Sequence, residues 1–63
     1  MSPEILPNGN RLLLLSEVAA VLRVSVKTVR RLIEEGKLKS IKVRGAVRIW
    51  LSDLMTYLQP ESH

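Results

Sequence analysis

The sequence predicts one small α+β domain, mainly helical, in which a β-hairpin lies between helices. Three observations support this class. Apolar residues recur at helical spacing in two neighbouring segments, and the period then changes to the alternation of a strand. The third is length, because 63 residues make one domain that buries only roughly 60% of its unfolded surface. With no cysteine and no phenylalanine, the core is expected to be aliphatic.

The ends of the chain differ from its middle. Residues 1–10 are expected to form a flexible N-terminal arm, because prolines and the turn-forming pair Asn8-Gly9 interrupt any regular period. The folded domain is expected over residues 11–59 and a disordered tail over residues 60–63. At the start of the domain, Arg11 to Leu15 is compatible with a short strand or with an extended lead-in.

The first helix is expected over about Glu17 to Leu22. Ser16 is the predicted N-cap, and Glu17 places a negative charge where the helix dipole favours it. The apolar face at helical spacing consists of Val18, Ala19, Val21 and Leu22.

The second helix is expected to begin after the N-cap Ser25 and to end before Gly36, a glycine typical of helix ends. Lys27, Arg31 and Glu34 lie at the centre of its polar face, with Thr28 and Arg30 at the flanks. Its apolar residues fall in one stripe: Val26, Val29, Leu32 and Ile33.

Beyond the second helix the pattern predicts a hairpin of about Lys39 to Ile49, interrupted by Arg44-Gly45-Ala46, where the chain can turn. A short closing helix is expected to follow, with Ser52 as its N-cap and Pro60 as its stop.

Two helices joined by a turn of three or four residues form a helix-turn-helix. Ala19 is small where the helices should cross, and Leu22 and Val24 are expected to flank the turn as core side chains. This arrangement presents the start of the second helix to the DNA major groove. The candidate major-groove residues are Ser25, Lys27, Thr28, Arg30 and Arg31.

The positive charge is concentrated in the same part of the chain. The segment Arg23 to Arg48 holds nine of the ten basic residues and two acids, a charge of +7, whereas the remainder carries −3. Such a distribution is typical of a protein that binds a polyanion. The alternative for Lys27 and Arg31 is a solvated helix face, and i,i+4 pairs with glutamates are a weak rival explanation for the arginines.

Catalysis and metal binding are not expected. The only histidine is His63, cysteine is absent, and there is no glycine-rich phosphate loop. We therefore expect no enzyme activity, no metal and no cofactor. The longest apolar run, Leu12 to Leu15, is too short to span a membrane, so we expect a cytoplasmic protein.

From Leu14 to Gln59 the chain resembles the excisionase-type helix-turn-helix family, which is related to the DNA-binding head of MerR-type regulators. The resemblance is carried by Leu15-Ser16-Glu17-Val18-Ala19, Leu22, Val24-Ser25, Thr28-Val29, Arg31-Leu32-Ile33, Glu35-Gly36-Lys37-Leu38, Ile41, Val43, Arg48-Ile49, Ser52-Asp53-Leu54 and Leu58.

This resemblance implies a winged helix-turn-helix with a recognition helix of Val26 to Glu35 and a wing around Arg44. The chain departs from the family pattern at Arg23, where glycine is common; a left-handed backbone there would cost about 1 kcal/mol. Arg23 is alternatively a phosphate contact. The candidate wing and backbone contacts are Arg23, Lys42, Arg44 and Arg48; for Arg44 and Arg48 the alternative is charge that keeps an exposed strand edge from aggregating.

The family further implies double-stranded DNA and an integrase or recombinase as partners. The first hypothesis is a recombination directionality factor, encoded by a bacterium or phage and associated with the nucleoid, that bends DNA and helps an integrase excise a mobile element. It is expected to be a monomer in solution that assembles cooperatively on DNA. The chain ends soon after the closing helix, which favours this role over the alternative, a small MerR-like transcriptional regulator. A second alternative is a protein-interaction adaptor that uses an exposed Trp50-Leu51 region.

Overall fold

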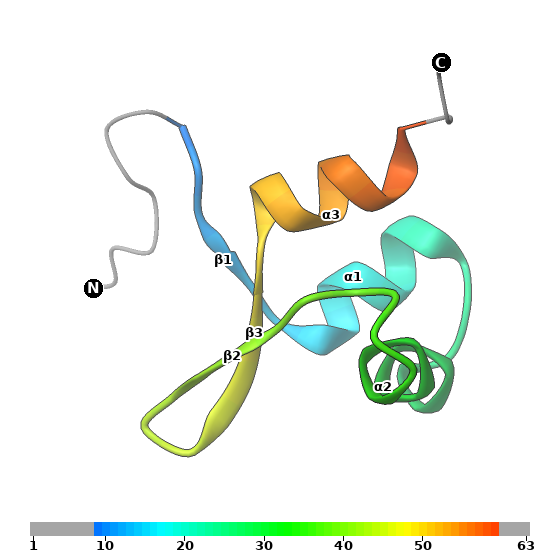
Figure 1. Cartoon of the computed structure of the whole chain (residues 1–63), viewed down its shortest axis with the longest axis horizontal. Coiled ribbons are helices and arrows are strands. Elements are labelled where there is room, and N and C mark those ends of the chain that lie inside the picture. The colour runs from blue at the N-terminus through cyan, green and yellow to red at the C-terminus, as the bar shows by residue number, and fades with distance from the viewer. Residues whose placement is uncertain (1–8, 60–63) are drawn as a thin grey trace.

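The computed structural model describes residues 9–59 and confirms the α+β class with a winged helix-turn-helix topology (Figure 1). Most of the expected arm and all of the expected tail lie outside the described residues. In chain order the elements are β1 (Leu12–Leu13), α1 (Leu15–Leu22), α2 (Val26–Glu34), β2 (Ile41–Val43), β3 (Ala46–Trp50) and α3 (Leu51–Leu58).

The three strands form one antiparallel sheet in the order β1-β3-β2. The segment that opens the domain is therefore a strand, with Leu12 opposite Trp50 and Leu13 opposite Ile49. Because β3 is the central strand, it joins the hairpin to the start of the domain.

The β2–β3 hairpin turns in two residues. Val43 is paired with Ala46, so Ala46 already belongs to β3, and the predicted three-residue interruption is one residue too long. Arg44 and Gly45 both have positive φ, 53° and 82°, as a type I′ turn requires. Glycine adopts this backbone without strain, whereas arginine does not.

Helix α1 begins two residues earlier than predicted, and Ser16 lies inside it instead of capping it. Leu14 holds the N-cap position, although its side chain cannot accept a hydrogen bond. The carboxylate of Glu17 reaches back and accepts one from the Leu14 N–H at 2.8 Å. This is half of a capping box, so the acid in the first turn replaces a capping hydroxyl.

Helix α3 also begins earlier than predicted, and Ser52 is likewise not its N-cap. The Ser52 N–H donates instead to Asn10 Oδ1 at 2.9 Å, and the Leu51 N–H donates to the Arg11 carbonyl at 2.8 Å. Asn10, expected to be the last residue of the arm, thus caps a helix 42 residues further along the chain.

Helix α2 begins as predicted, because Ser25 Oγ accepts a hydrogen bond from the Thr28 N–H at 3.1 Å. It ends at Glu34, one residue before the predicted end. Gly36 follows with φ +76°, while the Lys37 N–H donates to the Leu32 carbonyl at 2.9 Å. Together with the bond from the Gly36 N–H to the Ile33 carbonyl at 3.0 Å, this bond forms a Schellman ending, in which glycine is favoured.

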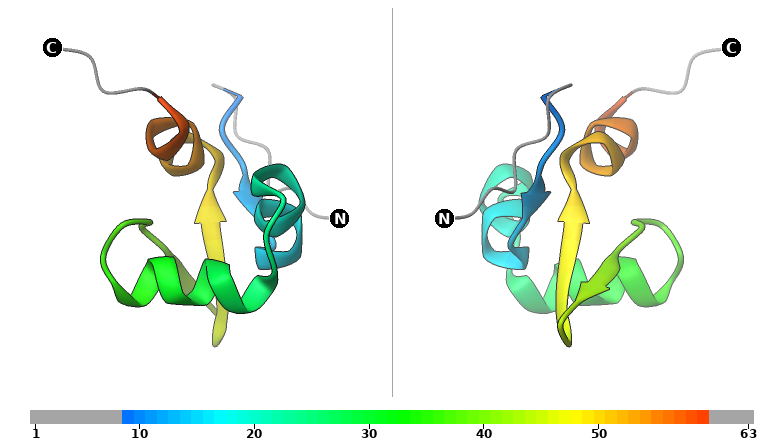
Figure 2. Two further views of the ribbon diagram at one scale, coloured as in Figure 1. Left: turned by 90° about the vertical axis from the view of Figure 1, so that its right-hand side faces the viewer. Right: turned by 90° about the vertical axis from the view of Figure 1, so that its left-hand side faces the viewer.

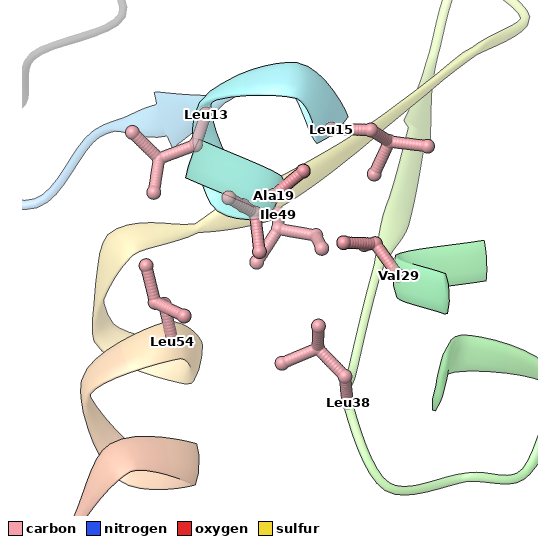
Figure 3. Packing of buried hydrophobic residues seen from close by; sticks show 8 residues of the cluster. Leu13, Leu15, Ala19, Val29, Leu38, Ile49 and Leu54 are labelled. Carbon is pink, nitrogen blue, oxygen red and sulfur yellow. The ribbon is translucent and has the colours of Figure 1, made fainter. Parts of the chain in front are cut away.

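The core is aliphatic and draws on every layer of the fold. Ile49 of β3 and Val18 of α1 are fully buried. Side chains of α2, α3 and the loop before β2 converge on Ile49 (Figure 3). Burying a side chain such as Ile49 stabilises the fold by about 1.5–3 kcal/mol. The buried cluster consists of Leu13, Leu15, Val18, Ala19, Val29, Leu38, Ile49 and Leu54.

Three residues expected on the apolar faces or at the turn are not part of this core: Val21, Val24 and Val26. Val21 of α1 is 56% exposed, and Val24, expected to plug the turn, is 38% exposed. Ala19 and Leu22 do pack in or against the core, so the helix crossing depends on them and not on the turn valine.

The two views of Figure 2 place α2 and the tip of the β2–β3 hairpin at one end of the molecule and α3 at the other. The core and the sheet connect the two ends. The element that a helix-turn-helix presents to DNA and the hairpin therefore lie at the same end.

Candidate nucleic-acid interface

The basic residues of α2 lie on the side of the helix away from the core. Val29 is fully buried, whereas Lys27, Arg30 and Arg31 are exposed. At 100° per residue, Lys27 and Arg31 project from nearly the opposite side of the helix to Val29. The predicted polar face is therefore present and open to solvent.

The arginines of α2 are not held by the glutamates of the same helix. Over residues 9–59 no ion pair joins Arg30 to Glu34 or Arg31 to Glu35; Glu35 Oε1 lies 3.4 Å from Lys37 Nζ instead. The i,i+4 explanation for the arginines is therefore wrong in this structure, and both guanidinium groups are available to a ligand.

Ser25 and Thr28, two of the candidate major-groove residues, have a local structural role. Their hydroxyl groups lie 3.1 Å apart, and Ser25 Oγ also accepts from the Thr28 N–H. Thr28 is half-buried. These side chains fix the start of α2, which sets where Lys27 and the arginines stand.

The candidate wing residues are distributed along the hairpin. Lys42 lies on β2 and Arg44 in the turn, and both are exposed. Arg48 lies on β3, is half-buried, and donates from Nη1 to the Val47 carbonyl at 3.0 Å. This hydrogen bond restricts the Arg48 guanidinium to the hairpin backbone, close to α2.

An open groove connects the start of α2 with the hairpin. Val26 and Arg30 line it from the helix, and Gly45 to Arg48 line it from the hairpin, while Leu14 to Ser16 complete it. Within residues 9–59 no acidic residue lines this groove, and an arginine contributes from each of the two elements. The structure thus brings Arg30 and Arg48 to a single concave surface.

Arg23 ends α1 in the left-handed conformation, with φ 60° and ψ 45°. The Val24 N–H donates to the Ala19 carbonyl at 3.0 Å, which closes the helix end in the way a glycine usually does. Arg23 therefore adopts the left-handed backbone that glycine usually supplies at this position. The Arg23 side chain is exposed at the turn between the two helices.

Val26 belongs to this surface, although the sequence pattern did not predict it there. It was assigned to the apolar stripe, yet it is 37% exposed and lines the groove. As the first residue of α2 it stands at the edge of the stripe. Its position beside Arg30, one turn later, was the signal that it could face the ligand side.

Two further observations bear on other classes of protein. Trp50 and Leu51, expected to be exposed, are both half-buried, and Leu51 packs against the core. No helix within residues 9–59 has the length and apolar character needed to cross a membrane.

The fold and the basic face together define a small winged helix-turn-helix protein. Comparison with known families matches residues 12–62 to the family described as the helix-turn-helix domain, and the chain belongs to that family. It is a family of DNA-binding domains, typically without enzymatic activity, so the partner of this chain is DNA. No curated protein and no solved structure matches significantly.

Proposed function

We propose that the chain binds double-stranded DNA in a sequence-specific manner, with α2 in the major groove and the β2–β3 hairpin along the neighbouring backbone or minor groove. The observation that carries this proposal is the acid-free groove with one arginine from each element. A helix-turn-helix uses the start of its second helix for base contacts, and arginine and lysine suit both phosphates and guanine.

The residues proposed for the major groove are Lys27, Arg30 and Arg31, with Ser25 and Thr28 at the helix start. Those proposed for the backbone or the adjacent minor groove are Arg23, Lys42, Arg44 and Arg48. Glu34 and Glu35 place negative charge at the C-terminal end of α2, which keeps that end away from phosphate.

A salt titration with a duplex of random sequence tests this proposal. Four to six phosphate contacts release counterions, so the association constant should fall roughly 10²- to 10³-fold between 50 and 200 mM salt. Fluorescence anisotropy measures the affinity. A response that is flat over this range contradicts DNA binding.

We further propose that this binding serves site-specific recombination, as in the excisionase-type family that the sequence resembles. In this role several copies bind side by side, bend the DNA and bias an integrase toward excision of a mobile element. Smooth bending of a short site costs on the order of 1–6 kcal/mol, and contacts between neighbouring copies or with the integrase would offset that cost.

Gel shifts on tandem sites, followed by footprinting with and without the integrase, test the recombination role. Cooperative stepwise complexes and an extended footprint in the presence of the integrase are expected. Independent occupancy of single sites, with no effect of the integrase, favours the small transcriptional regulator.

One observation supports the adaptor alternative. Met55, Tyr57 and Leu58 of α3 are exposed apolar side chains at the end of the molecule opposite α2. Such side chains favour contact with a protein. The salt titration separates the two functions, because an adaptor does not require duplex DNA.

A further inference from the structure

One member of the apolar stripe of α2 is less buried than the others and lies outside the core cluster. Val29 is fully buried, and Leu32 and Ile33 pack against the core, whereas Val26 is 37% exposed. An exposed valine costs helix stability slightly compared with alanine, because its branched side chain loses rotamer freedom. The exposed part of this side chain is therefore open to a ligand.

Val26 occupies the place from which a recognition helix contacts bases. It is the first residue of α2, directly after the N-cap Ser25. In a helix-turn-helix, the amino-terminal residues of the second helix reach the base edges. Val26 also lines the groove between α2 and the hairpin, together with Arg30 and Arg48.

The chemistry of this groove selects the base feature that Val26 can contact. The two arginines supply positive charge for the DNA backbone and for purine acceptors. Valine has no hydrogen-bonding group, so it can recognise only an apolar feature of a base pair. The major groove offers one such feature, the C5-methyl group of thymine.

We propose that Val26 is a specificity-determining residue that contacts the C5-methyl group of a thymine in the major groove. This inference rests on the proposed DNA binding and assigns a base preference within it. Arg30 contacts the major groove beside Val26, and Arg48 contacts the DNA backbone or the adjacent minor groove. The Ser25 cap fixes the start of α2, from which Val26 projects.

The test removes the methyl group without changing any hydrogen bond. A duplex that the wild-type chain binds best is selected from a randomised pool, and each thymine is replaced in turn by deoxyuridine. At one position the wild-type affinity should fall about three- to fivefold, as expected for one buried methyl group. Fluorescence anisotropy at fixed salt gives the dissociation constants.

Three variants assign this effect to Val26. Val26→Ala should lose the response to deoxyuridine at that position, with a ratio of the two affinities near one. Val26→Ile should keep it. Val21→Ala is the matched control, because Val21 is 56% exposed on α1, does not line the groove, and should leave the ratio unchanged.

The outcomes separate this inference from the proposed function. Absence of duplex binding, or binding that ignores salt, would contradict the function itself. Salt-dependent binding with no deoxyuridine-sensitive position, or with the same sensitivity in Val26→Ala as in the wild type, would overturn the role of Val26 alone. Circular dichroism of each variant confirms that it is folded.

Discussion

At the scale of single residues, two arginines adopt a backbone conformation that usually belongs to glycine. Arg23 ends α1 with φ 60°, and Arg44 begins the hairpin turn with φ 53°. A left-handed backbone costs a non-glycine residue roughly 1–2 kcal/mol. Both side chains are exposed and basic, so the strain is consistent with a use of their charge in binding.

Replacing Arg23 by glycine should therefore raise stability and lower affinity together. Relief of the left-handed strain, reduced by the greater freedom of glycine in the unfolded chain, should add about 0.5–1 kcal/mol to the free energy of unfolding. Urea denaturation measures the first effect and anisotropy with duplex DNA the second. Unchanged affinity would limit Arg23 to a structural role.

The outward arginine Arg31 provides a more direct test of the helix face. Arg31→Ala should cost about 1–3 kcal/mol of binding free energy if it contacts a base, with no change in the melting temperature. Lys37→Ala is the control, because it removes the same charge from an exposed residue that is paired with Glu35 at 3.4 Å. Equal losses for the two variants would mean that only net charge matters.

The outward-facing residues of α2 could be predicted from the sequence, because successive side chains of a helix are rotated by a constant angle. The spacing places Lys27 and Arg31 opposite Val29, and the structure agrees. The same reasoning failed for Val26, which stands at the edge of the stripe, and the expectation that Val24 is a core side chain at the turn was wrong as well. Their exposure depends on the neighbouring chain, which a helical period does not describe.

At the scale of elements, the start of a helix could be predicted from the sequence only where the contacts that cap it are local. The start of α2 was predicted correctly because its cap, Ser25, is the adjacent residue. The starts of α1 and α3 were wrong because a side chain three residues inside the helix and the distant Asn10 satisfy their first N–H groups. A serine next to a helix start is therefore an uncertain signal.

The capping of α3 by Asn10 can be tested by substitution. Asn10→Ala removes the acceptor for the Ser52 N–H and should lower the free energy of unfolding by about 1 kcal/mol, typical of a lost N-cap. Asn10→Asp keeps the acceptor oxygen and should retain most of this stability. Thermal unfolding distinguishes them; two variants that unfold like the wild type would show that Asn10 does not support α3.

At the scale of the whole molecule, the fold keeps the elements of the candidate DNA interface apart from α3. The hairpin tip and α2 lie at one end, and α3 with its exposed apolar residues lies at the other (Figure 2). The hairpin and the charge block were predicted from the sequence, but their common groove was not, because β3 brings Arg48 beside Arg30 only in three dimensions.

The central claim is that the chain binds duplex DNA through α2 and the hairpin. Titrating a duplex into the ¹⁵N-labelled protein and following the backbone amide signals tests this claim directly. The largest chemical-shift changes should map to residues 25–31 and 44–48, with α3 nearly unaffected. Changes concentrated on α3, with α2 and the hairpin unmoved, would contradict it.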